Sequence, residues 1–163
     1  MARTGRIAGL AGLIGAALLA GCATTPEARF ASLGPLRTAL STSPETLRQR
    51  ADRNDANAQM ALSLLYQYGQ GGVAKDPVQA MLLRQRATAQ RGSTPITTYI
   101  AGLNGKPGRV STIFVPRYDV SPGQAAFNAA CANALARGDR SARGVEPCGG
   151  EEGYDHLAAA WGR

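Results

Sequence analysis

The sequence has few of the side chains on which enzymes depend: it contains one histidine, His156, and three cysteines among 163 residues. Catalysis requires an acid, a base or a nucleophile that converge on one site. Cys131 and His156 can be written as a thiol nucleophile and its base. His156, however, falls beside the apolar stripe of a predicted helix, which favours a surface or packing role. The sequence therefore predicts no catalytic residues and a protein that is not an enzyme.

Signatures of cofactor and metal sites are also missing. With one histidine and widely separated cysteines, the chain shows no zinc or calcium spacing. The glycine-rich segment 69–72 superficially resembles a phosphate loop, but a predicted helix precedes it where a strand is required. We expect no cofactor and no metal.

The chain also lacks an apolar run long enough to span a bilayer. The run from Ile7 to Leu18 is shorter than the roughly 20 residues of a spanning helix. Arg3 and Arg6 precede this run and small residues follow it. A basic start, a short apolar segment and small residues are typical of a secretory signal peptide, so we expect export.

The tetrapeptide at 19–22, Leu-Ala-Gly-Cys, resembles the lipobox of bacterial lipoproteins. This resemblance implies a signal peptide over residues 1–21, cleavage before Cys22 and diacylation of Cys22 as a membrane anchor. Ala23 is not the aspartate associated with inner-membrane retention, which favours the outer membrane, facing the periplasm. The alternative is an ordinary signal peptide followed by an unrelated cysteine.

With Cys22 assigned to lipid by that resemblance, Cys131 and Cys148 remain. Two cysteines in an oxidising compartment predict one disulfide. Closing such a loop contributes about 3 kcal/mol in the chain-entropy model. The alternative is a reactive thiol.

We predict a mainly α fold. Residues 22–42 read as a lipidated tether with a possible short helix after Pro35. Ser43 and Pro44 begin a helix to about Arg53 that buries Leu47 and Ala51. A second helix begins near Ala56 and ends at the glycines of 69–72, and a third runs from Pro77 to about Gln90.

Residues 55–92 resemble one Sel-one-like repeat, a relative of the tetratricopeptide repeats. The positions that carry the resemblance are Ala58, Gln59, Leu62, Tyr66, Gly69, Gly71, Val73, Asp76, Ala80, Ala87 and Gly92. The resemblance implies an antiparallel helix pair within residues 43–92 that presents a groove to another protein. Because a solenoid needs about three repeats to bury its core, we expect the segment after Gly92 to cover the exposed faces.

Residues 93–163 are predicted to form an extended segment and a C-terminal helical cap. The β-branched stretches 97–100 and 110–115 flank two turn signals, which predicts a hairpin or two extended strands, with a degenerate second repeat as the alternative. Ser121 begins a helix to Arg137. Its predicted buried face comprises Phe127, Ala130, Cys131, Ala134 and Leu135. A last helix after Cys148 carries a stripe of Tyr154, Leu157, Ala158 and Trp161, and the disulfide would join the two helices.

The formal net charge is +7, and the densest basic groups lie at 48–53 and 84–91. These groups indicate solvated helix faces, or attraction to anionic headgroups or acidic envelope polymers. Nucleic acid is excluded as a partner of an exported protein. We therefore expect a lipid-anchored adaptor or scaffold that binds an envelope protein through its helical repeat, or else a peptidoglycan-associated factor. The candidate partner-binding residues are Tyr68, Arg84 and Tyr118.

Overall fold

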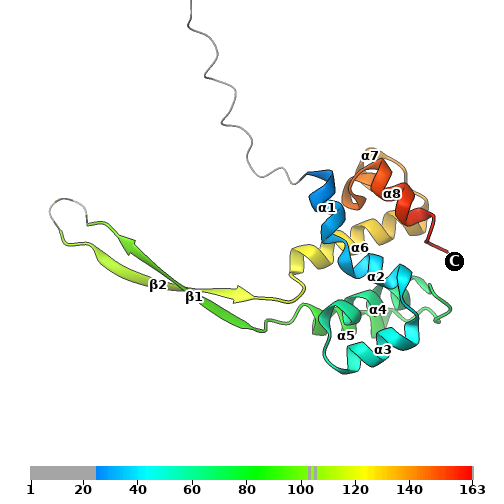
Figure 1. Ribbon diagram of the computed structural model, residues 1–163, viewed down its shortest axis with the longest axis horizontal. Coiled ribbons are helices and arrows are strands. Elements are labelled where there is room, and N and C mark those ends of the chain that lie inside the picture. The colour runs from blue at the N-terminus through cyan, green and yellow to red at the C-terminus, as the bar shows by residue number, and fades with distance from the viewer. Residues whose placement is uncertain (1–24, 103, 105, 163) are drawn as a thin grey trace, which may run out of the picture.

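The computed structural model describes residues 25–102, 104 and 106–162. The predicted signal peptide and Cys22 lie outside these residues. The described chain forms a mainly helical body from which one long hairpin projects (Figure 1). The predicted fold class is thus confirmed in outline.

The predicted short helix after Pro35 is present, and most of the segment before it, predicted as a tether, is also helical. Helices α1 (Pro26–Ser32) and α2 (Gly34–Ser41) follow each other after Thr25, whose hydroxyl accepts the Ala28 N–H at 3.2 Å. Leu33 and Leu36 have no exposed surface. Burying two leucines stabilises the fold by about 1.5–3 kcal/mol each, so these residues pack on the body instead of acting as a spacer.

The three predicted helices of the central region are present. They are α3 (Pro44–Asp52), α4 (Ala56–Tyr68) and α5 (Pro77–Ala87). Their N-termini are capped by Ser43, Asp55 and Asp76, and α4 ends at Gly69 with a left-handed φ of 69°. Helix α5 stops at Ala87, earlier than predicted, because Thr88 already caps its C-terminus.

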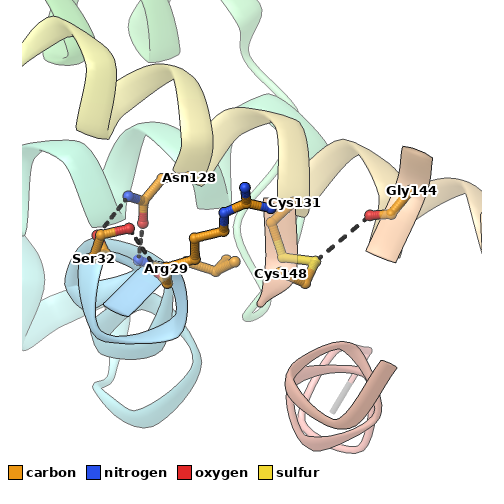
Figure 2. The surroundings of a disulfide bond; sticks show 7 residues. Arg29, Ser32, Asn128, Cys131, Gly144 and Cys148 are labelled. Atoms are coloured by element: carbon orange, nitrogen blue, oxygen red, sulfur yellow. Dashed lines mark hydrogen bonds between the residues drawn. A yellow bond between two sulfur atoms is a disulfide. The ribbon is translucent and has the colours of Figure 1, made fainter. Parts of the chain in front are cut away.

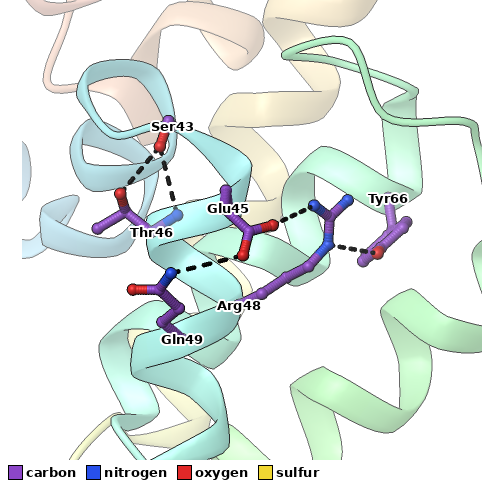
Figure 3. A network of polar contacts seen from close by, with 6 residues as sticks. All are labelled: Ser43, Glu45, Thr46, Arg48, Gln49 and Tyr66. Carbon is purple, nitrogen blue, oxygen red and sulfur yellow. Dashed lines mark hydrogen bonds and ion pairs between the residues drawn. The ribbon is translucent and has the colours of Figure 1, made fainter.

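Helices α3 and α4 are joined by a polar network at the surface (Figure 3). Arg48 donates from Nε to the Tyr66 hydroxyl at 3.4 Å and forms an ion pair with Glu45 at 3.3 Å. Arg50 forms a second ion pair with Asp55 at 2.8 Å. These contacts engage two arginines of the densest basic group with groups of the same chain.

Helix α4 lies at the centre of the body and contributes to two hydrophobic clusters. Its Ala58, Leu62 and Leu65 pack with residues of α2, α3 and α5. Its Met60 and Leu64 pack in a larger cluster with the N-terminal helices and the C-terminal region. Residues from both ends of the chain thus pack on α4.

The C-terminal region contains α6 (Pro122–Arg137), α7 (Ala142–Val145), the 3₁₀ helix η1 (Glu146–Cys148) and α8 (Glu151–Ala158). The predicted disulfide joins Cys131 to Cys148 with a Cα–Cα distance of 5.0 Å (Figure 2). Both half-cystines are fully buried. The disulfide joins α6 to η1. Cys131 is therefore not a free thiol.

The predicted buried face of α6 was partly wrong. Phe127 is 44% exposed and Ala130 is exposed, whereas Asn128 is fully buried. The Asn128 side chain accepts the Leu36 N–H at 2.8 Å and donates to the Ser32 carbonyl at 3.1 Å. Because the asparagine satisfies the backbone at the start of α2, the helix turns this polar side chain inward and leaves the phenylalanine outside.

Strands β1 (Gly92–Ile100) and β2 (Arg109–Arg117) form the predicted antiparallel hairpin and are longer than expected. The hairpin extends away from the helices (Figure 1). The hairpin therefore does not cover the helices, whereas the C-terminal part of the segment after Gly92 packs on α4. The backbone groups that face between β1 and β2 pair with each other, whereas those on the two outer edges have no further strand beside them.

Candidate functional site

The projecting hairpin exposes apolar side chains on both of its faces. The register pairs Ile96 with Ile113 on one face and Tyr99 with Val110 on the other. Tyr99, Val110 and Phe114 are each exposed by about two thirds, and the remaining exposed apolar side chains of the hairpin are Ile96, Ile100, Ile113 and Val115. An antiparallel sheet usually packs one face on a core and turns a polar face to water. Here neither face is covered by the described chain.

Contacts between the strands stabilise the hairpin, hereafter the arm, along its length. The Thr97 and Thr112 hydroxyls lie 3.2 Å apart across the pair. Nearer the tip, the Tyr99 ring lies against Gly108, where a side chain at position 108 would collide with the tyrosine hydroxyl. Cross-strand contacts such as these are the main source of stability in a two-stranded sheet. At the turn, Asn104 adopts a left-handed φ of 54°.

Arg91 fixes the base of the hairpin to the helical body. Its Nε forms an ion pair with Asp119 at 3.0 Å, and its Nη2 donates to the Asn54 carbonyl at 3.3 Å in the α3–α4 connection. Its backbone N–H donates to the Arg117 carbonyl at 2.9 Å. The hairpin is thus held at its base and extends away from the helices (Figure 1).

The hairpin is basic. Residues 92–117 contain Lys106, Arg109 and Arg117 and no aspartate or glutamate. Arg109 and Arg117 are exposed. None of the ion pairs found among the described residues involves Arg109 or Arg117. The arm therefore combines apolar surface with uncompensated positive charge.

The predicted partner-binding residues do not form one surface. Tyr68 is half-buried and packs edge-to-face on Trp161, with ring centroids 5.6 Å apart. Burial raises the pKa of Tyr68, although the positive charges of Arg84 and Arg137 act to lower it. Arg84, on α5, lies close to Tyr68. The Arg84 Nε is buried and has no hydrogen-bond partner. Tyr118 directly follows β2, and none of the contacts found among the described residues joins it to Tyr68 or Arg84.

A second exposed apolar patch lies on α5, where Val78, Met81 and Leu82 share one side of the helix. Val78 is 64% exposed, and the other two are about half exposed. The sequence predicted the inner residues of this helix correctly, since Ala80, Leu83 and Ala87 are buried.

His156 does not belong to a catalytic arrangement with Cys131, because that cysteine is oxidised. The histidine ring contacts Phe30 edge-to-face at 5.7 Å, and Arg37 lies over the same phenylalanine at 5.1 Å. The three side chains border a shallow groove of about 370 Å³ between α1 and α8. Among the described residues, no three metal-ligating side chains come together. Within the described parts of the chain, no helix is long and apolar enough to cross a membrane.

Comparisons with protein-family models, with curated proteins and with solved structures give no match to this chain. The features of the folded chain therefore carry the functional argument. Sequence reasoning located the hairpin but assigned it a covering role. Its composition marks neither face as wholly polar, because one alternate set of β2 carries Val110 and Phe114 and the other carries Ile113 and Val115.

Proposed function

We propose that this protein is a lipid-anchored adaptor of the bacterial cell envelope and that the β1–β2 hairpin is its binding arm. Cys22 would supply the lipid anchor at the outer membrane, and the body would hold the arm in the periplasm. The observation that carries the proposal is the exposure of Tyr99, Val110 and Phe114 on a strand pair that extends away from the helices. Exposed apolar patches of this kind mark interaction surfaces.

The architecture of the body supports this role. A free two-stranded hairpin is marginally stable in water. Here Arg91 holds the base of the hairpin on a helical body that contains a disulfide. Anchoring to a surface would raise the effective concentration of the arm near envelope partners. A Sel-one-like helix pair at α4 and α5 would serve as the scaffold, with the apolar patch on α5 as a secondary contact.

Binding to peptidoglycan through the basic helix faces is less favoured. Arg48, Arg50 and Arg91 each form an ion pair with a carboxylate of the same chain. Their charge is therefore partly neutralised, whereas Arg109 and Arg117 of the hairpin take part in none of the ion pairs found among the described residues. Arg53, directly after α3, and Arg86, on α5, are also outside these pairs, so positive charge remains on the body as well as on the arm.

The proposal is tested by shortening the arm. Replacing residues 97–112 by Asn-Gly keeps the Ile96–Ile113 pair and closes it with a two-residue turn. Crosslinking in intact cells should capture a defined envelope protein with the full chain and lose it with the shortened chain. Equal capture with both chains would contradict the role of the arm, and recovery of sacculus fragments alone would favour the peptidoglycan factor.

The anchor is tested separately. Cys22→Ala should leave the protein uncleaved or release it from the membrane fraction, because the acylated sulfur is lost. Metabolic labelling with a fatty-acid analogue, followed by fractionation, measures this. Unchanged labelling in the variant would contradict the lipid anchor.

A further inference from the structure

The free backbone edges of the hairpin are unequal. In an antiparallel pair, opposed residues alternate between those that exchange two hydrogen bonds and those that exchange none. Pro95 and Pro116 lack an N–H, and both fall in the same alternate set as the Thr97–Thr112 pair. This set is therefore the one without hydrogen bonds, and its backbone groups point outward. The 3.2 Å approach of the two threonine hydroxyls agrees with the closer spacing of such pairs.

Only β2 offers a long uninterrupted edge. On β1, Pro95 interrupts the outward N–H groups and leaves those of Thr97 and Tyr99 beyond it. On β2, the outward N–H groups of Val110, Thr112 and Phe114 follow one another, and the proline at 116 falls at the base. Proline on an edge blocks the pairing of a further strand. The outer part of β2 is therefore the part of the arm most open to strand addition.

The β2 edge also carries a charge pattern. Arg109, Ile113 and Arg117 lie on one face, because residues two apart in a strand point the same way. The two arginines stand eight residues apart, about 27 Å along the strand. Between them the same face presents Ser111, Ile113 and Val115. A complementary strand would alternate apolar side chains in its middle and carry a carboxylate at each end.

We propose that the β2 edge binds an extended acidic segment of a partner protein as a third strand of the sheet. The backbone of Val110–Phe114 provides the main-chain hydrogen bonds, and Arg109 and Arg117 pair with carboxylates on the incoming strand. A third strand also relieves the marginal stability of an isolated hairpin. This inference rests on the proposed function, in which the hairpin is the binding arm.

Two other occupants fit the arm less well. A second copy of the hairpin would bring like charges together, since each hairpin carries three basic residues and no acid. A lipid bilayer would leave the outward N–H and C=O groups without hydrogen-bond partners, which is costly in hydrocarbon. An acidic strand satisfies both the backbone and the charge.

The test uses purified full-length protein and a fluorescent nine-residue peptide with Glu at both ends and Val alternating with Thr between them. Its two carboxylates have the same spacing as Arg109 and Arg117. The expected result is saturable binding by fluorescence anisotropy. The same peptide with Lys in place of Glu should bind at least about tenfold more weakly.

Single-residue variants distinguish the contribution of the backbone edge to peptide binding from that of the side chains on the sheet face. Thr112→Pro and Thr112→Ala both lose the hydroxyl contact with Thr97, but only the proline removes the outward N–H and adds a ring on the edge. Thr112→Pro should weaken binding of the acidic peptide about tenfold or more, and Thr112→Ala by about twofold or less. Thr97→Pro, on the opposite edge, should behave like the alanine variant. Unchanged thermal unfolding of all three variants confirms that the body is intact.

Charge reversal provides the second part of the test. The double variant Arg109→Glu and Arg117→Glu should lose the acidic peptide and gain the lysine peptide. Equal effects of Thr112→Pro and Thr112→Ala, equal binding of the two peptides, or no saturable binding up to about 1 mM would overturn the inference.

The two proposals fail in different ways. If cellular capture depends on the full hairpin but is unaffected by Thr112→Pro and by charge reversal, strand addition is wrong and the adaptor stands. If capture does not depend on the hairpin, both are wrong. Crosslinks from position 112 to a second copy of the chain would overturn the acidic partner in favour of self-association.

Discussion

The Asn128 side chain accepts the Leu36 backbone N–H at 2.8 Å, across a sequence separation of 92 residues. The same amide donates to the Ser32 carbonyl at 3.1 Å and to the Gln124 carbonyl at 2.8 Å. One buried side chain thus joins α6 to the junction of α1 and α2. It explains why residues 26–41 pack on the body instead of forming a tether.

Replacing this asparagine should destabilise the protein markedly. Asn128→Ala leaves the Leu36 N–H and the Ser32 carbonyl buried without that partner, which costs about 1–3 kcal/mol. Asn133→Ala on the same helix is the matched control, because Asn133 contacts only the exposed Arg137 side chain among the hydrogen bonds found. It should change stability by less than about 0.5 kcal/mol. Urea unfolding followed by circular dichroism measures both.

Loss of the disulfide should destabilise the C-terminal cap. The bond between Cys131 and Cys148 closes a separation of 17 residues. In the chain-entropy model such a loop contributes about 3 kcal/mol. The double variant Cys131→Ser and Cys148→Ser should lose about this free energy of unfolding, and reductant should then have no further effect. A reductant-sensitive midpoint in the double variant would contradict the assignment.

Acid should weaken the start of α4 through Asp55. Burial alone raises the pKa of this carboxyl, but hydrogen bonds from the Ala58 N–H and from Arg50 outweigh it and lower the pKa below its usual 3.8. The ionised form therefore stabilises the fold above the unfolded-state pKa, and this contribution is lost as the pH falls through the folded-state pKa.

Two variants separate the cap from the charge. Asp55→Asn keeps an N-cap oxygen and should flatten the stability profile below about pH 4. Asp55→Ala should also lose about 1 kcal/mol at neutral pH. Urea midpoints across pH 2.5–7, a range chosen to bracket the usual carboxyl pKa, provide the measurement. An acid dependence of Asp55→Asn equal to that of the unaltered protein would contradict the role of this carboxylate.

The edge prolines should protect the arm from pairing with other copies. Pro95→Thr together with Pro116→Thr restores outward N–H groups on both edges and should increase concentration-dependent association. Pro107→Thr, in the tip loop, is the control and should leave the oligomeric state unchanged. Sedimentation velocity over a concentration series distinguishes them. No added association in the double variant would show that other features already block edge pairing.

The local signals in the sequence predicted the helices well. Ser43, Asp55 and Ser121 each cap the helix that follows, because a capping side chain bonds to the backbone two or three residues ahead. The cysteine pairing was also predictable, since two cysteines remained once Cys22 was assigned to lipid by resemblance. The hairpin followed from β-branched residues around a turn.

Long-range relationships were not accessible in this way. The contact between Asn128 and Leu36 joins distant segments, and no local pattern marks a buried asparagine as preferable to Phe127. The direction of the hairpin depends on Arg91 meeting Asn54 and Asp119, which are also distant in sequence. The predicted partner-binding residues Tyr68 and Tyr118 were selected as aromatic residues, a criterion that does not distinguish them from the more exposed Tyr99.

The central claim is that the hairpin, and not the helical body, contacts the partner. Its most direct test is a photo-crosslinking amino acid placed at Phe114 on the arm or at Phe127 on α6, both exposed aromatic positions. In intact cells, position 114 should crosslink to one envelope protein, and position 127 should give none of that product. Crosslinking of the same protein from 127, with none from 114, would contradict the account.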